Sequence, residues 1–327
     1  KKWISLESDH ELKSEQPFTH CIINCSNWIN LNSINEVNLI TRKIKRWNIP
    51  TYAIGLGAQF KNADEKLALN LKSDSFIEFI NAIIQTGGTY SVRGAQTADL
   101  ISRWGLERPF VFGCPSLLGH GVPKQLANDK KLICFNGDEW LYKFILIPNS
   151  FFIDQASLFH ICYRQSLRTR LNSLASIKVK NRRLFGQKRI FLPKNLGSWS
   201  HQVSKAGLSV GTRIHGTIIA ILNGVPAVLL YHDSRTKELA DFYGIPNMNV
   251  DLIKNSEQAL SLARDLCAIP TNFKERVLQN KRDFNDWCTK NSVPLSASER
   301  KISFSTKTDA PRPYSTRLEE CILKLRD

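Results

Sequence analysis

The sequence has no apolar run close to the roughly 20 residues that a helix needs to cross a bilayer. It has no charged-then-apolar leader, and its only methionine is Met248, so we expect the natural chain to begin before Lys1, with a first β-strand there. Low-complexity tracts and internal repeats are also missing. We therefore expect a folded cytoplasmic protein that crosses no membrane.

The eight cysteines lack the spacings of metal and redox sites, because no pair is arranged as CxxC. Cys21 and Cys25 lie four residues apart in a probable strand, which suits neither a zinc site nor a redox pair. No cluster of His, Asp and Glu has the spacing of metal ligands. We expect reduced, partly buried thiols and neither a metal nor a cofactor.

Acidic residues are too few to balance the basic ones, which leaves a net charge of +16. Residues 163–189 are rich in arginine and lysine and contain no acidic residue. Such a stretch suits nucleic acid, an anionic membrane surface, a phosphorylated substrate, or simply a solvated face. Because no zinc-finger or RNP-type signature accompanies it, we expect no nucleic acid. We predict peripheral contact with the inner face of the membrane, which neutralising three of these arginines should weaken in a liposome-binding assay.

Strand and helix patterns alternate along the chain. We predict strands at 20–25, 51–57, 90–93, 110–114, 132–135, 144–148, 189–192, 208–210 and 227–231. We predict helices at 34–47, 75–85, 96–104, 154–164, 198–206, 217–223, 236–243 and 317–324. Apolar strands between amphipathic helices are typical of parallel sheets covered on both faces.

These patterns predict an α/β protein of two doubly wound, Rossmann-like domains that face a cleft. The polar, Gly- and Pro-bearing segment 117–130 sets the boundary. It divides an N-terminal domain (1–120), truncated at its start, from a C-terminal donor-binding domain (121–327) that ends in helices. A cleft between domains is the usual ligand site.

The most informative stretch is 208–231, LSVGTRIHGTIIAILNGVPAVLLY, which reads as a strand, a polar turn, a helix and a second strand. The turn carries Gly211, Thr212, Arg213, His215 and Gly216. In open parallel sheets, ligands bind where strand ends meet helix N-termini, and the helix dipole favours an anion there. Histidine titrates near neutrality and suits acid–base chemistry. We predict that Arg213 and His215 hold and protonate an anionic small molecule.

A second arginine follows a strand in the first half, in TYSVRGAQTADLISRWGL. If Arg93 and Arg213 converge on one site, two guanidinium groups suit a ligand with two anionic groups. Each residue also has a structural alternative. Arg93 suits a local cap or pair, Arg213 an interdomain salt bridge, and a lone histidine such as His215 is often structural.

The segments SVRGAQTADLISRWGL, VFGCPSLL and SVGTRIHGTIIAILNGVPAVLLYHDSRTKELADFYGIP resemble the polysaccharide pyruvyl transferase family over roughly residues 50–118 and 186–247. The resemblance implies a fold like that of the GT-B glycosyltransferases. It also implies transfer of pyruvate from phosphoenolpyruvate to two hydroxyls of a sugar, which forms a cyclic ketal. Arg93, Arg213 and His215 then match the family's donor site, and Lys237 stands at its lysine position.

Two segments depart from the family pattern. The early Gly-rich turn is replaced in residues 24–30 by Asn24, Ser26 and Asn27, and the acid of a Gly-Asp-Pro strand end is replaced by Cys114. Our leading interpretation is a transferase acting on a cell-surface glycan or its lipid-linked precursor, with phosphoenolpyruvate as donor and no cofactor.

Two alternatives stay open at this point. A glycosyltransferase with a nucleotide-sugar donor would be stabilised by that donor and not by phosphoenolpyruvate. A non-catalytic protein that binds glycan or nucleic acid on the same scaffold would show strong salt dependence and would keep its role without Arg213 or His215. Fold alone does not separate the three, and the sequence identifies neither the acceptor sugar nor the oligomeric state.

Overall fold

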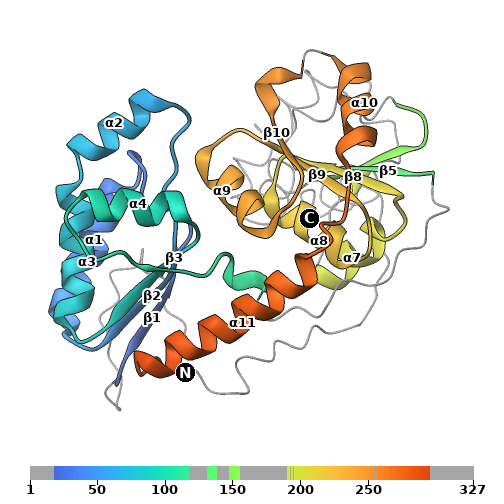
Figure 1. Ribbon diagram of the computed structural model, residues 1–327. Helices are drawn as coiled ribbons and strands as arrows, with labels where there is room; N and C mark the ends of the chain where they lie inside the picture. The colour runs from blue at the N-terminus through green and yellow to red at the C-terminus, as the bar shows by residue number, and fades with distance from the viewer. Residues whose placement is uncertain are drawn as a thin grey trace, which may run out of the picture. The chain divides into compact units, whose positions relative to one another are not determined.

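The computed structural model describes residues 18–117, 131–137, 147–154, 190–191, 193, 195–253 and 255–294. They belong to two compact units, each built around a parallel sheet (Figure 1). The first unit comprises Lys1–Gly119, Asp233–Tyr243 and Glu275–Ile302, and the second comprises His120–His232, Gly244–Lys274 and Ser303–Asp327. The prediction of an α/β protein with two parallel sheets is confirmed.

The two units do not correspond to a single division of the chain near residue 120, because the first unit contains segments from both sides of that point. Helix α9 (Ser234–Tyr243) and most of helix α11 (Phe273–Lys290) belong to the first unit. They return to it because α9 is hydrogen-bonded to the first unit through Ser234, Glu238 and Tyr243, while α11 buries aromatic side chains there. Contacts between residues so distant in sequence leave no local pattern.

The first unit has four parallel strands in the order β1-β2-β3-β4. Their bounds are Cys21–Asn24, Thr51–Leu56, Thr89–Val92 and Phe110–Val111. Four helices precede or follow these strands: α1 (Ile34–Trp47), α2 (Ala63–Leu71), α3 (Asp74–Gln85) and α4 (Ala95–Arg103). Because successive right-handed crossovers all advance in one direction, α1, α3 and α4 cover the same face of the sheet (Figure 1).

Helix α11 covers the opposite face of this sheet (Figure 1). Strand β2 has side chains on both faces, and Ala53 and Leu56 lie together in the core beneath α1 and α3 because the strand is irregular between them. Tyr52 and Ile54 pack instead with Phe284 and Trp287 of α11. In the described residues the second face is therefore closed by the C-terminal part of the unit and not by a crossover helix.

The second unit has six parallel strands in the order β10-β9-β8-β5-β6-β7. Their bounds, in chain order from β5, are Ile133–Gly137, Ser150–Asp154, Ile190–Phe191, Leu208–Gly211, Ala227–Tyr231 and Asn247–Asn249. The chain starts in the middle of the sheet, runs outward to β7, and returns to place β8 beside β5. This is the winding of dinucleotide-binding folds, and it reverses between β5 and β8.

Three helices of the second unit are described: α7 (Leu196–Val203), α8 (Ile214–Leu222) and α10 (Ser256–Leu266). Helix α7 begins with a capping box in which Asn195 and Ser198 satisfy each other's backbone N–H groups. Short 3₁₀ turns occur at Pro115–Leu117 and Val250–Leu252. No helix among the described residues combines the length and apolar character needed to span a membrane.

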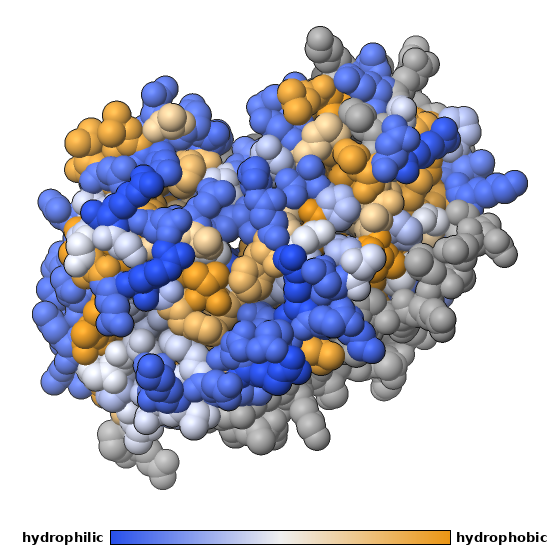
Figure 2. Space-filling view, in the orientation of Figure 1, coloured by the Kyte–Doolittle hydropathy of each residue, from blue (hydrophilic) through white to orange (hydrophobic). Residues whose placement is uncertain are grey.

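Several predicted elements differ from the structure. Of the strand expected at 144–148, residues 147 and 148 lie in a turn that precedes β6, and residues 144–146 are outside the described part. Asp154 ends β6 where a helix was expected to begin, and residues 155–164 are also outside the described part. Strand β4 stops at Val111, before Gly113 takes a positive φ of 80°. Helices α2, α10 and α11 and strand β10 were not predicted. Helix α2 gives a weak signal because two of its three leucines are exposed: Leu67 is 60% and Leu71 79% exposed, whereas Leu69 is buried. Hydrophobic residues lie on the surface over α2 in Figure 2.

Candidate active site

The second unit brings five of the predicted site residues together where the sheet reverses its winding. Strand β8 ends at Gly211, Thr212 follows, and Arg213 is the N-cap of α8. The N–H groups of Gly216 and Thr217 both donate to the Arg213 carbonyl, at 3.1 and 3.3 Å. The carboxyl ends of strands at such a reversal border the crevice in which open α/β sheets bind ligands.

Helix α8 is buried on almost all sides, so few of its side chains can reach a ligand. All its residues except His215 are buried or half-buried, and His215 is exposed. Because the surrounding isoleucines anchor the helix in the core, the backbone of His215 is held at a fixed position on the N-terminal turn. The Arg213 side chain, half-buried one residue before the helix, lies at the same end.

The floor of this corner is closely packed by backbone and small polar side chains. The Thr212 N–H donates to the Asn136 carbonyl at 3.0 Å, and the Asn136 side chain donates to Ser209 Oγ at 2.7 Å. A Cβ at Gly211 would lie 2.5 Å from Asn136 Oδ1, and one at Gly137 would overlap Thr212 Oγ1. Glycine at both positions leaves room for the polar side chains packed between the ends of β5 and β8. The sequence interpretation ended the strand at 135 and so missed Asn136 and Gly137, although an Asn-Gly pair after an apolar run marks a strand end.

Arg93 lies at the corresponding corner of the first unit but points into the protein. It is 5% exposed, and its guanidinium donates to the Gly55 carbonyl through Nε and to the Cys25 carbonyl through Nη2, both at 2.9 Å. The side chain thus ties together the carboxyl ends of β1, β2 and β3. These contacts correspond to the local pairing that the sequence left open as an alternative.

The N-terminus of α4, beside Arg93, already holds a carboxylate. Glu238 of α9 accepts hydrogen bonds from the Thr97 N–H at 2.7 Å and from Thr97 Oγ1 at 3.0 Å. Burial raises the pKa of Glu238, while the bonds from Thr97 oppose that rise. A Cβ at Gly94 would overlap the Glu238 side chain. This carboxylate occupies the place where the helix dipole would favour a ligand anion.

Lys237 and Cys114 also lie in the first unit. Lys237 Nζ pairs with Asp241 at 2.5 Å on the partly exposed side of α9. The Cys114 N–H donates to the Tyr243 hydroxyl at 3.0 Å, inside the unit. The position that carries an acid in the family pattern therefore anchors α9.

The described cysteines are free thiols: Cys21, Cys25, Cys114, Cys134, Cys267 and Cys288. Burial raises the pKa of Cys134, on β5, to about 12, so its thiol stays protonated at neutral pH. Within the described ranges, no group of three or more His, Cys, Asp or Glu side chains is placed to hold a metal. The basic stretch 163–189 lies outside the described residues.

Three solved structures are similar to this chain. A UDP-N-acetylglucosamine 2-epimerase has a TM-score of 0.43 and 12% identity, covering 87% of this chain and 75% of its own. The glycosyltransferase SnogD from Streptomyces nogalater has a TM-score of 0.31 and 10% identity, covering 82% and 95%. A UDP-GlcNAc 2-epimerase from Neisseria meningitidis bound to UDP-GlcNAc has a TM-score of 0.30 and 12% identity, covering 94% and 76%.

No curated protein matches the chain in sequence. The family model for polysaccharide pyruvyl transferase matches residues 6–234, which is more than half of the chain and includes both arginine-bearing corners. The resemblance drawn from the sequence is thereby confirmed. The chain belongs to the polysaccharide pyruvyl transferase family and is a transferase.

Proposed function

We propose that the corner formed by β8 and α8 binds phosphoenolpyruvate and that His215 transfers the protons of the reaction. The observation that carries this proposal is the position of Arg213, the N-cap of α8, and His215, in its first turn, at the reversal of the second sheet. Phosphoenolpyruvate carries a phosphate and a carboxylate. A helix N-terminus and a guanidinium each bind such groups.

The proposed reaction needs one acid–base group and two sugar hydroxyls. The His215 imidazolium gives a proton to the methylene carbon of phosphoenolpyruvate, which makes the adjacent carbon electrophilic. One sugar hydroxyl adds to that carbon and returns a proton to His215. The carbon–oxygen bond to phosphate then breaks, the second hydroxyl of the same sugar forms the ketal, and its proton leaves with inorganic phosphate. Arg213 would stabilise the charge that develops on the phosphate.

The acceptor in this proposal is a sugar of a cell-surface polysaccharide or of its precursor. A cytoplasmic location, with peripheral contact to an anionic membrane, belongs to the same proposal. The roles of Arg93 and Lys237 as substrate contacts stay predictions. The contacts of Arg93 support a positioning role, because its guanidinium is bonded to two backbone carbonyls.

Thermal unfolding with and without phosphoenolpyruvate tests the donor site. Ligand at about 100 times its dissociation constant stabilises a one-site protein by about 2.7 kcal/mol. We expect this stabilisation in the natural protein, its loss in Arg213→Ala, and in His215→Ala a retained shift with loss of inorganic phosphate release.

Arg264→Ala serves as the matched control, because Arg264 is an exposed arginine of the same unit, on α10. It should leave the response to phosphoenolpyruvate unchanged. If the natural protein responds to nucleotide sugars and not to phosphoenolpyruvate, the proposal is wrong and the glycosyltransferase alternative holds. An equal loss in Arg264→Ala would show that the effect reflects total charge and would also overturn it.

A further inference from the structure

The first unit contains a polar hollow of about 440 Å³ at the carboxyl ends of β1 and β2. Its lining comes from the two loops that follow these strands and from the first turns of α1 and α2. The lining residues are Asn27, Asn30, Leu31, Asn32, Ser33, Glu36, Gln59, Lys61 and Glu65. All but one are polar, and four carry side-chain amides. This segment is where the sequence departs from the Gly-rich turn of its family.

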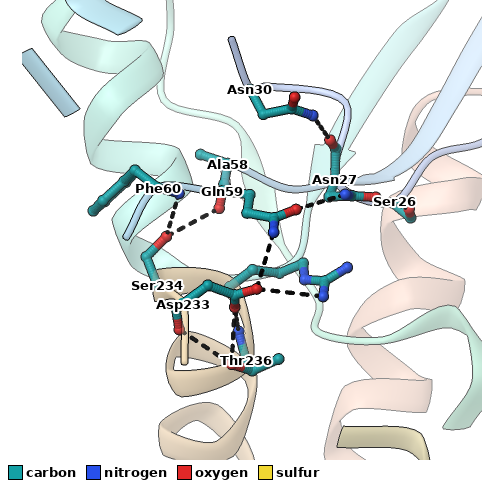
Figure 3. Close-up of polar contacts among 10 residues, drawn as sticks. Ser26, Asn27, Asn30, Ala58, Gln59, Phe60, Asp233, Ser234 and Thr236 are labelled. Carbon is teal, nitrogen blue, oxygen red and sulfur yellow. Dashed lines mark hydrogen bonds and ion pairs between the residues drawn. The ribbon is translucent and has the colours of Figure 1, made fainter. Parts of the chain in front are cut away.

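The amides of the hollow are oriented by a chain of hydrogen bonds that runs in one direction (Figure 3). Ser26 Oγ donates to Asn27 Oδ1 at 2.7 Å, Asn27 Nδ2 donates to Gln59 Oε1 at 2.6 Å, and Gln59 Nε2 donates to Asp233 Oδ2 at 3.1 Å. Asp233, 3% exposed, is held in turn by the Thr236 N–H and hydroxyl, both at 2.8 Å to Oδ1. Because a carboxylate only accepts hydrogen bonds, Gln59 turns its NH2 group toward Asp233 and its oxygen toward Asn27. That oxygen in turn accepts from the NH2 group of Asn27, so the orientation of both amides is fixed.

The fixed amides determine what kind of group they can bind. A side-chain amide nitrogen has two N–H bonds, and in the described contacts Asn27 and Gln59 each use one of them within the chain. The second N–H of each is available to an oxygen acceptor. Asn30 adds rigidity, because its amide donates to the Asn27 carbonyl while its oxygen accepts from the Asn32 N–H at 2.9 Å. Preoriented donors on a rigid loop suit the hydroxyl and ring oxygens of a sugar.

The charges of the hollow argue against an anion. The lining carries two carboxylates, Glu36 and Glu65, and one lysine, Lys61, and Glu65 accepts a bond from the Lys61 backbone N–H at 2.6 Å. Glu36 lies in the first turn of α1, where its negative charge interacts favourably with the positive end of the helix dipole. A phosphate or a carboxylate placed here would meet an excess of negative charge, whereas an uncharged hydroxyl-rich molecule would not.

We propose that this hollow binds an uncharged saccharide residue and discriminates against acidic sugars. The inference rests on the proposed function in one respect, since the bound sugar would be the acceptor. In this assignment Gln59 and Asn27 contact the saccharide, and Asp233 is a positioning residue that acts through Gln59. Glu36 contributes the selectivity through its charge.

Matched glycosides test the inference: methyl β-glucoside against methyl β-glucuronide, and methyl β-galactoside against methyl β-galacturonide. Each pair differs only at C6, which is a hydroxymethyl carbon in the neutral glycoside and the carboxylate carbon in the uronide. Dissociation constants come from saturation-transfer NMR titrations up to about 50 mM, where a site with a Kd of a few millimolar is filled. We expect at least one neutral glycoside to bind and its uronide to bind at least about threefold more weakly.

Four variants connect the binding to named residues. Gln59→Ala removes two amide donors and should weaken neutral-glycoside binding about tenfold. Asp233→Asn keeps an oxygen for the Thr236 N–H but no longer orients Gln59, so the loss should be intermediate. Glu36→Gln should reduce the preference for the neutral member of a pair. The control is Glu78→Gln, which changes an exposed carboxylate paired with Lys45 elsewhere in the same unit and should change nothing.

Three results would overturn the inference: no neutral glycoside binds, a uronide binds as tightly as its partner, or Gln59→Ala binds like the natural protein. Phosphoenolpyruvate stabilisation, measured on the same samples, separates this failure from that of the proposed function. A natural protein that responds to phosphoenolpyruvate but binds no glycoside rejects the hollow alone. One that binds neutral glycosides but ignores phosphoenolpyruvate rejects the donor proposal and keeps the saccharide site.

Discussion

The two strand-to-helix corners of this protein both carry an arginine between a strand and a helix, but they differ in how exposed that arginine is and in which side chain lies at the helix N-terminus. At the β3–α4 corner, Arg93 is buried and Glu238 occupies the helix N-terminus. At the β8–α8 corner, Arg213 is half-buried and His215 is exposed on the helix N-terminus. The difference comes from what the rest of each unit brings to the corner. Helix α9 supplies the carboxylate in the first unit, and in the second unit the sheet reverses its winding.

The comparison separates two uses of an arginine after a strand. A guanidinium bonded to two buried carbonyls fixes strand ends, and its removal should appear mainly in stability. A guanidinium beside an exposed histidine at a reversal of winding is placed to meet a ligand, and its removal should appear mainly in binding. The predictions below test this separation, beginning with the largest expected change in stability.

The Arg93→Ala substitution should destabilise the first unit by about 3–5 kcal/mol, because it leaves two buried carbonyl oxygens without their charged donor. Arg213→Ala should cost about 1 kcal/mol or less. Urea unfolding of both variants measures the contrast, and Arg93→Lys, which can reach only part of the same network, should fall between Arg93→Ala and the natural protein. Equal losses for the two alanine variants would refute the separation.

Glu238→Ala should destabilise the first unit by about 1–3 kcal/mol, since the buried Thr97 N–H loses its acceptor. Glu238→Gln keeps one oxygen for that N–H and should cost less. The alanine variant also opens the N-terminus of α4, so inorganic sulfate should raise its unfolding midpoint more than that of the glutamine variant. The same sulfate response in both variants would show that this corner holds no anion site even when emptied.

The sequence predicted the parts of this fold that local patterns control. Helix α1 has its predicted bounds because four buried side chains recur at helical spacing, from Val37 to Ile44. Strands β2, β3, β8 and β9 agree with their predictions within one residue at either end, because their short runs of mostly buried residues lie between turn residues. The second corner was found because arginine, histidine and two glycines sit together in the sequence.

The parts that the sequence did not reveal depend on distant contacts. Glu238 and Thr97 are 141 residues apart, so nothing near Arg93 indicates that its corner is filled. The amide hollow joins Gln59 to Asp233, 174 residues later, and its asparagines read from sequence only as a missing Gly-rich turn. Side chains that cap or orient a site from another element require the tertiary structure to be recognised.

Acidity offers a finer test of the first corner. Burial raises the pKa of Glu238 in the folded protein, so the folded state binds a proton more readily than the unfolded state. Near neutral pH the buried, charged carboxylate therefore lowers the free energy of unfolding. As the pH falls the carboxylate is protonated, and this destabilisation disappears. The unfolding midpoint of the natural protein, relative to non-titrating Glu238→Gln, should rise as the pH falls from neutral toward the ordinary glutamate pKa of about 4.3. A difference that is flat or falls over this range would contradict the assignment.

The smallest change in stability is expected at His215, and it is the most informative for the second corner. The side chain is exposed and contributes nothing to the buried face of α8, so His215→Ala should alter the free energy of unfolding by no more than about 0.5 kcal/mol. A neighbouring substitution on the same helix, Ile218→Ala, removes a buried side chain and should cost about 2–5 kcal/mol, which calibrates the urea measurement. If His215→Ala were as destabilising as Ile218→Ala, the imidazole would be a structural group. A small loss of stability combined with loss of phosphate release would instead show that His215 acts in the chemical step. The β3–α4 corner of the first unit has the same strand-to-helix arrangement, but there Glu238 occupies the helix N-terminus.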